Sequence, residues 1–263
     1  MDILSYSFFQ HALLGALLAS VLCAVVGTYV VTRRLVIAGG GIAHASLGGV
    51  GIGAYFHFSP LLGATGFAIL TGFAINYLSR QREVREDSAI AMLWTLGMSI
   101  GLLFAFLTPG FVTDLQSYLF GNILSITSFD LWCIGLLTLV TLFLFGFGLR
   151  TIECVAYDRD FAQTQGLPVA WIESVLTILV ALTIVSCLQL VGIILVVALL
   201  SIPQATAALF TSSFKGMMWL SGLFSYASCL GGLALSYALN IPSGVAIILV
   251  SISIYFLSRL FAR

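Results

Sequence analysis

Long apolar runs make up most of the chain, and only short polar breaks interrupt them. Runs of about 20 apolar residues with few charges are typical of membrane-spanning helices. Strand-like alternation punctuated by turns is absent from the sequence, so a transmembrane β-barrel is not expected. All ten basic residues fall in five places along the chain: Arg33/Arg34, Arg80/Arg82/Arg85, Arg150/Arg159, Lys215 and Arg259/Arg263.

The intervals between these basic groups predict the number of spans. Lys and Arg collect in cytoplasmic loops, so each interval should hold an even number of crossings. Two spans fit into each of four intervals: residues 35–79, 88–149, 173–214 and 216–258. The expected reversals lie near residues 57–60, 109–128, 192 and 240–243. With one span before Arg33, the pattern predicts an all-α integral membrane protein, a polytopic bundle of nine transmembrane helices with the N-terminus outside and the C-terminus inside. Eight spans result if one segment only dips into the bilayer.

Composition agrees with this pattern. Of the 263 residues, 60% are hydrophobic and 8% are charged, whereas soluble domains carry about 25% charged residues. We therefore expect one transmembrane domain over residues 1–263, in contact with lipid as a multi-pass protein of the bacterial inner (plasma) membrane. The start lacks a basic segment and carries the acidic Asp2, so a cleavable signal peptide is not expected. No nucleic-acid partner is expected.

Sequence motifs for ATP hydrolysis and for the common hydrolases are missing. A Walker A motif needs Gly-Lys-Ser/Thr, and the single lysine, Lys215, follows Phe214. The patterns H-E-x-x-H and G-x-S-x-G are absent as well. Acidic residues lie at the outer side or in cytoplasmic segments rather than within the spans, where ion-coupled transporters usually carry them. The chain is therefore not expected to be an enzyme, and any transport would need energy from another subunit.

The longest inner loop, at about residues 151–172, contains residues that predict a short helix. Asp158 is suited to its N-cap and Asp160 to its first turn. Gly166 suits the C′ position, and Pro168 follows as a stop. Phe161 and Leu167 are apolar among polar neighbours. The residues alone leave two interpretations open: a simple connector, or a helix that docks into a groove of a cytoplasmic partner.

The second expected helix carries one ionisable side chain, His44. Reading every fourth residue gives a row of Gly41, Ala45, Gly49 and Gly53, a pattern that lets membrane helices approach closely. The neighbouring row places a glycine one turn on either side of His44, which predicts clearance around the imidazole. His44 is then either a structural histidine hydrogen-bonded across helices or a ligand on a translocation path. Neutral imidazole is a common ligand of Zn²⁺ and similar metals, although one histidine does not complete a site.

The remaining histidines and the cysteines are expected to have simpler roles. His11 and His57 lie at outer ends of spans, where polar tips meet lipid headgroups. The five cysteines occur singly, without a C-x-x-C pair, and are expected to be packing residues in helices. A soft-metal role for Cys23 with Cys187 is the remote alternative.

Four segments, in order along the chain, resemble a known family. RRLVIAGGGIAHASLGGVGIGAYF resembles the second-helix signature of the permease subunits of bacterial zinc, manganese and iron ABC importers. DLQSYLFGNILSI is similar to their outer-loop motif, ECVAYDRDFAQTQGLPV to their coupling loop, and LQLVGIILVVALLSIPQATAALF to the segment that follows.

This resemblance implies a homodimeric helical permease with the path between protomers and no tightly bound cofactor. A separate cytoplasmic ABC ATPase would drive transport, and an extracytoplasmic metal-binding protein would deliver the metal. The ATPase would dock on the coupling loop, through Asp158, Arg159, Asp160, Phe161, Gly166, Leu167 and Pro168.

The same resemblance sets the expectation for the metal. Family members commonly carry an Asp four residues before the histidine, and Gly40 stands at that position here. His44 therefore carries over alone, with supplementary oxygen donors expected from Asp114, Asn122, Gln189 and Gln204. The sequence A-H-A-S resembles that of the zinc branch of the family. The loss of the carboxylate at position 40 points away from Mn²⁺. Zn²⁺ is the expected cargo, with Mn²⁺ and Fe²⁺ open.

Two other functions remain open from the sequence. A permease for a metal chelate such as haem or a siderophore would have a wide path that does not depend on His44. A structural or sensor membrane protein without transport would have no ATPase partner.

Overall fold

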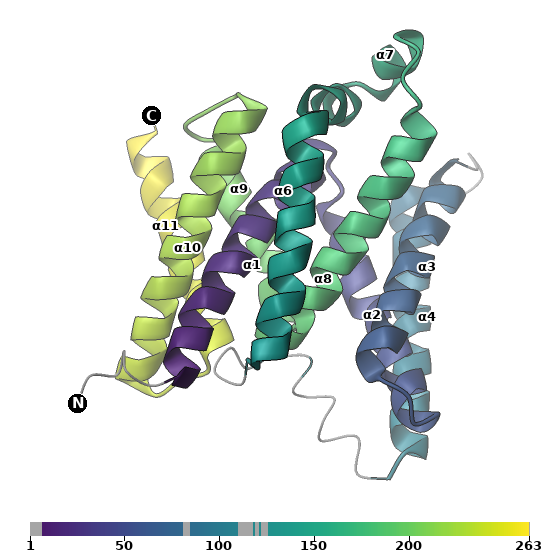
Figure 1. Cartoon of the computed structure of the whole chain (residues 1–263), viewed down its shortest axis with the longest axis vertical. Coiled ribbons are helices and arrows are strands. Elements are labelled where there is room, and N and C mark those ends of the chain that lie inside the picture. Colours follow the sequence, from purple (N-terminus) through teal and green to yellow (C-terminus); the bar gives the residue numbers. More distant parts are fainter. Residues whose placement is uncertain (1–6, 81–84, 110–117, 119–120, 122–125, 263) are drawn as a thin grey trace.

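The computed structural model describes residues 7–80, 85–109, 118, 121 and 126–262, and its described elements are all helices (Figure 1). They are α1 Ser7–Thr32, α2 Val36–Tyr55, α3 Pro60–Arg80, α4 Glu86–Leu107, α6 Ser128–Tyr157, α7 Arg159–Thr164, α8 Val169–Leu199, α9 Ile202–Ala207, α10 Phe214–Leu239 and α11 Ser243–Phe261. In Figure 1 the N-terminus lies at the lower end of the bundle, whereas α7 and the C-terminus lie at the upper end. Because the basic residues Arg33, Lys215 and Arg259 accompany the upper ends of their helices, this end is the cytoplasmic one.

Nine segments of the described chain are long and apolar enough to cross a membrane, as the sequence predicted. Two of these spans, Val169–Leu188 and Leu190–Ala207, follow directly on one another, and Gly192, with φ 77° and ψ 163°, breaks the helix near the start of the second. A Cβ atom at Gly121 would collide with the backbone of Val191 and Gly192. The reversal expected near residue 192 is therefore confirmed, and an odd number of spans accounts for termini at opposite ends.

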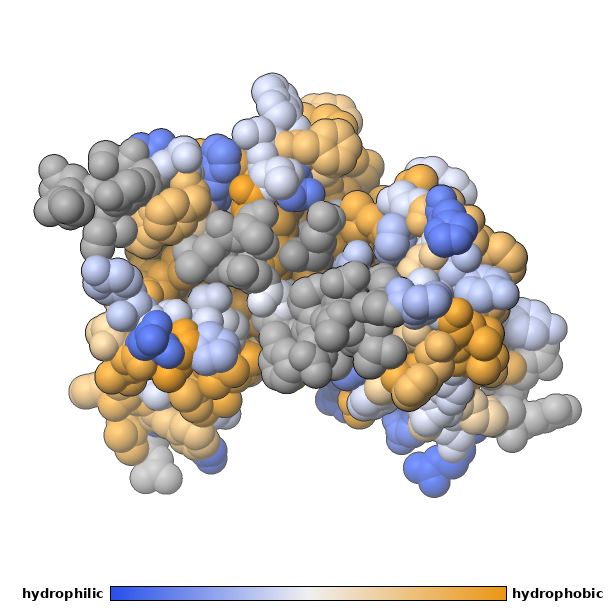
Figure 2. All heavy atoms as spheres, turned by 90° about the horizontal axis from the view of Figure 1, so that it is seen from below, coloured by the Kyte–Doolittle hydropathy of each residue, from blue (hydrophilic) through white to orange (hydrophobic). Residues whose placement is uncertain are grey.

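The outside of the bundle is suited to lipid. Large apolar side chains stay exposed along the spans; Trp132, Phe147 and Trp219 expose 79%, 83% and 79% of their surface. Figure 2, viewed from the outer end, shows hydrophobic side chains along the flanks and two lobes with a recess between them. A soluble protein would not leave so much aromatic surface in water, so the flanks face the membrane.

Glycines hold α2 against two neighbouring helices. On one side, a Cβ at Gly49 would collide with the carbonyl of Gly63 in α3. On the other, a Cβ at Gly97 of α4 would lie 2.6 Å from the carbonyl oxygen of Ala45. The predicted row of small residues is thus a packing surface, but its members are shared between α3 and α4 instead of serving one partner. Such close backbone approach is how membrane helices gain packing energy.

The cytoplasmic connection between α6 and α8 is shorter than the loop of residues 151–172 expected from the sequence, because α6 continues to Tyr157 and α8 begins at Val169. Between them, the Asp158 side chain accepts a hydrogen bond from the Phe161 N–H at 2.9 Å and caps α7. Gly166 has φ +75°, and the N–H groups of Gly166 and Leu167 donate to the carbonyls of Gln163 and Ala162. This is a complete Schellman ending, so the capped helix predicted from Asp158 and Gly166 is confirmed.

Candidate functional site

The imidazole of His44 lies against α4 in the middle of the bundle. Its ring stacks on the indole of Trp94, with centroids 4.5 Å apart and planes 13° apart. The Trp94 Nε1–H donates to the Met98 sulfur at 2.9 Å, which fixes the indole. The His44 Nδ1 atom is buried without a hydrogen-bond partner, and the side chain as a whole is half-buried. A structural histidine would be hydrogen-bonded across helices, and within the described part of the chain no such bond to this ring is made.

The two glycines that flank His44 on its own face have different surroundings. A Cβ at Gly40 would meet only Val197 of α8, at 3.9 Å, which is an ordinary contact. A Cβ at Gly48 would lie 2.8 Å from the Gly97 carbonyl oxygen and 3.0 Å from the Phe67 ring. Clearance beside the imidazole therefore exists on the Gly40 side only. On the other side, the prediction of clearance was wrong, because Gly48 serves helix contact with α4.

Of the predicted supplementary donors, the structure describes only one side chain. Asp114 and Asn122 lie outside the described residues, as does the side chain of Gln189. Gln204 is fully buried, and its amide N–H groups donate to the carbonyls of Cys23 at 2.8 Å and Leu199 at 3.1 Å. This amide ties α1 to the corner between α8 and α9, while its Oε1 atom has no partner. A ligand role for Gln204 stays a prediction.

Gly27 leaves the space for that amide, since a Cβ there would lie 2.9 Å from the Gln204 Cδ atom. Within the described ranges, no group of three or more His, Cys, Asp or Glu side chains could hold a metal. The described part of this chain thus offers a metal one imidazole, and a complete coordination shell needs donors from elsewhere.

The other histidines and the cysteines take structural positions. His11 donates from Nδ1 to the Ile126 carbonyl at 3.3 Å, and His57 is exposed just beyond the outer end of α2. Cys23 and Cys187 are fully buried with their sulfur atoms 3.8 Å apart, and Cys229 is also fully buried. All five cysteines are free; Cys23, Cys187 and Cys229 are packing residues as expected, whereas Cys133 is exposed.

An ion-pair cluster, which the sequence did not suggest, lies where α7 meets the bundle. Glu173, near the start of α8, is only 7% exposed. Its Oε1 atom accepts a hydrogen bond from Arg33 at 2.8 Å and lies 3.1 Å from Nε of Arg159. The one signal in the sequence was that Glu173 is the last acidic residue of the chain, at the start of a long apolar run. Arg33 lies far from Glu173 in sequence, and Arg159 belongs to a separate helix, so the meeting of the three side chains could not be read from spacing.

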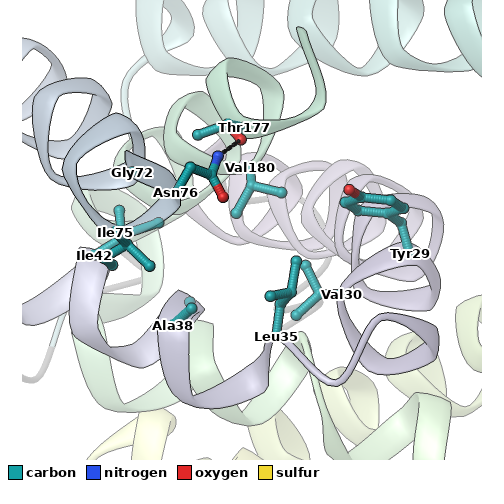
Figure 3. A pocket seen from close by; sticks show the side chains of 11 residues that line it. Tyr29, Val30, Leu35, Ala38, Ile42, Gly72, Ile75, Asn76, Thr177 and Val180 are labelled. Atoms are coloured by element: carbon teal, nitrogen blue, oxygen red, sulfur yellow. Dashed lines mark hydrogen bonds between the residues drawn. The ribbon is translucent and has the colours of Figure 1, made fainter. Parts of the chain in front are cut away.

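A polar pocket of about 250 Å³ opens beside this cluster. Its lining includes Leu35 before α2 and Glu86 at the start of α4. Below it lies a small cavity of about 30 Å³ that reaches Ala38 and Ile42 of α2. Figure 3 shows this cavity, with Asn76 donating to Thr177 across one side of it at 2.7 Å. The cluster therefore lies at the cytoplasmic base of the helices that carry His44 and Trp94.

Comparisons with known proteins place the whole chain in one class. The model of the ABC 3 transport family matches residues 5–262, so the chain belongs to this family of ABC-transporter membrane permeases. It is 39% identical to an uncharacterised membrane protein of Synechocystis sp. over 99% of this chain and 92% of that one. It is 36% identical to the manganese transport system membrane protein MntC of Halalkalibacterium halodurans over 99% of this chain and 89% of that one.

A solved structure shows the same fold. PsaBC from Streptococcus pneumoniae, in complex with Fab, superposes with a TM-score of 0.88 at 29% identity, covering 97% of this chain and 92% of the matched chain. Together with the nine spans, the family membership defines a multi-pass transport subunit of the inner membrane. Its class is that of the ABC-transporter permeases.

Proposed function

We propose that this chain forms the path by which a divalent transition metal enters the cytoplasm, with His44 as a ligand along that path. The observation that carries the proposal is the state of the His44 ring: half-buried inside a span, oriented by Trp94, and with a buried nitrogen that no described group satisfies. Polar groups inside a membrane bundle are costly and usually functional. A weak site with few protein ligands suits passage, because tight binding would slow release.

A second copy of the chain would complete the path. The described part of one chain offers His44 alone, whereas a stable zinc site takes about four ligands. A two-fold dimer would bring two imidazoles to one path, since a symmetric interface presents the same residues from both subunits. Homodimerisation would thus supply donors that the described part of one chain lacks.

Energy would come from a separate ATPase docked on α7. The chain contains no Gly-Lys-Ser/Thr sequence, whereas α7 is capped at both ends and exposes 53% of Phe161 at the cytoplasmic end. A short rigid helix with one exposed aromatic ring fits a groove on a partner. An extracytoplasmic metal-binding protein would deliver the metal to the outer end of the path.

Two observations favour different cargoes. The donor set favours Zn²⁺, because imidazole suits zinc and Gly40 supplies no carboxylate of the kind Mn²⁺ prefers. The Halalkalibacterium relative, named as a manganese transport system membrane protein, favours Mn²⁺. A metal chelate such as haem would need a wide path and would not depend on His44.

Uptake into proteoliposomes tests the proposal. The chain is reconstituted with its ATPase and binding-protein partners, and radioactive Zn²⁺, Mn²⁺ and Fe²⁺ are offered separately with and without internal ATP. ATP-dependent accumulation of a free metal ion supports the function, and the ion accumulated fastest identifies the cargo. Accumulation of a haem or siderophore complex without uptake of free ions would contradict it.

A further inference from the structure

The cluster of Arg33, Glu173 and Arg159 joins three elements at one carboxylate oxygen. Arg33 follows α1, Glu173 belongs to α8, and Arg159 is the first residue of α7. Arg33 lies directly before Arg34, whose φ of +59° makes the tight turn into α2. A movement of α7 therefore reaches the start of α2 through two ion pairs and one turn.

The two arginines do not hold Glu173 equally. Arg33 makes the shorter contact, 2.8 Å against 3.1 Å, and its side chain is less exposed, 23% against 34%. Leaving a buried carboxylate without a partner is strongly unfavourable, but Arg33 would still neutralise Glu173 after Arg159 had moved away. Arg159 is thus the member of the cluster that can be released at modest cost.

The surroundings leave room for such a release. Nε of Arg33 and Nε of Arg159 are buried without a hydrogen-bond partner of good geometry, so each guanidinium group keeps an unused donor. The polar pocket of about 250 Å³ beside it is lined by both arginines and by Tyr29, Asn76 and Thr177. Space and polar groups are therefore present for Arg159 to change position.

We propose that Glu173 is a positioning residue that transmits displacement of α7 to the cytoplasmic base of α2 and α4, and so to His44 and Trp94. Arg33 holds Glu173 to the α1–α2 turn, and Arg159 connects it to α7. This inference rests on the proposed function, because α7 moves only if an ATPase docks there. Glu173 would touch neither the metal nor the ATPase, yet it would set how many metal ions cross for each ATP hydrolysed.

The number of metal ions taken up per ATP hydrolysed tests this role, measured with both rates in one preparation of the complete reconstituted complex. Arg159→Gln cuts the link to α7 and leaves the Arg33–Glu173 pair intact. Because Arg159 also belongs to the expected docking loop, ATPase binding is titrated for this variant, and the ratio is measured at saturating ATPase. Glu173→Gln removes the shared charge. Each variant should lower the ions-per-ATP ratio about tenfold while hydrolysis continues, a size typical of coupling between sites. Arg159→Lys should restore part of the ratio.

Matched controls are available at the same end of the molecule. Arg150 is exposed in α6, and Asp87 is exposed in the first turn of α4. Arg150→Gln and Asp87→Asn should keep the wild-type ratio.

An unchanged ratio in both Arg159→Gln and Glu173→Gln would overturn the inference, and so would a proportional fall in uptake and hydrolysis, which indicates a merely structural role. If Glu173→Gln does not assemble, the ratio of Arg159→Gln at saturating ATPase decides, because weaker docking alone would not lower the ratio once the ATPase is bound. Absence of ATP-driven uptake by the wild-type complex would refute the proposed function itself, and this inference with it.

Discussion

His44 and Trp94 form a parallel stack between α2 and α4, with ring centroids 4.5 Å apart. The contact fixes the plane of the imidazole without using either ring nitrogen. A neutral imidazole has one nitrogen lone pair that can bind a metal, and the stack with Trp94 leaves that lone pair unused. Stacking on an aromatic ring therefore orients the ligand while keeping it available.

Removing the indole should impair uptake without breaking the fold. In Trp94→Ala the imidazole loses its support and can turn, so we expect uptake to fall by roughly tenfold, the order of effect seen when groups that orient a ligand are removed. Trp94→Phe keeps a stacking face and should retain most of the activity. Trp219→Ala, which removes a lipid-exposed tryptophan, is the matched control. Equal uptake by Trp94→Ala and Trp219→Ala would show that the stack has no role.

Gly40→Asp should change metal preference. The new Cβ would meet only Val197, at 3.9 Å, so the side chain fits without moving backbone. A carboxylate one turn from His44 adds a hard oxygen ligand, which should raise Mn²⁺ uptake relative to Zn²⁺. Competition between the two ions during ATP-driven uptake measures the ratio. An unaltered ratio in a correctly assembled variant would mean that residue 40 does not face the path.

Gly49→Ala should destabilise the protein. The added methyl group would enter the space taken by the Gly63 carbonyl, so α2 and α3 must separate. Overpacking of this kind costs about 2 kcal/mol. Gly66→Ala is the control, because no atom lies within 4 Å of its Cβ and alanine favours the helix. Thermal unfolding in detergent should show a lower midpoint for Gly49→Ala and an unchanged or higher one for Gly66→Ala; similar midpoints would contradict the packing described.

Asp158→Ala should weaken docking of the ATPase. Its side chain caps α7 at 2.9 Å from the Phe161 nitrogen, and loss of an N-cap costs about 1 kcal/mol. A helix as short as α7 would fray, and the position of Phe161 would be less defined. Titration of the purified permease with the ATPase measures the affinity, and Asp158→Asn, which can still cap, should behave like wild type. Unchanged affinity in Asp158→Ala would show that α7 is only a connector.

The number of spans and the capped helix between two of them could be predicted from sequence because they depend on local properties, although the ends of α6 and α8 could not. Charge placement gave the sidedness, and the break at Gly192 and the caps of α7 at Asp158 and Gly166 depend on residues close in the chain. These features follow from hydropathy, backbone freedom and capping, each of which acts within a few residues. The row of small residues in α2 was also visible, but not that α3 and α4 would share it.

The candidate site was predicted less completely because its contacts are tertiary. His44 could be singled out as an unusual residue within a span, yet nothing in the pattern indicated Trp94 as its neighbour. The metal-donor role expected of the Gln204 oxygen stays a prediction, and nothing in the pattern indicated that the N–H groups of this amide join α1 to the α8–α9 corner. Glu173 was noted only as a cytoplasmic acid, since its arginine partners become neighbours only when the chain is folded.

His44→Ala, compared with His57→Ala in ATP-driven uptake of free metal, tests the central claim most directly. His57 is exposed just beyond the outer end of α2, the helix that carries His44. The control therefore removes an imidazole close by in the chain without removing the proposed ligand. Both variants should assemble with the ATPase and hydrolyse ATP. We predict that His44→Ala loses most of the uptake while His57→Ala keeps the wild-type rate. Equal uptake by the two variants would show that the metal does not pass by way of His44.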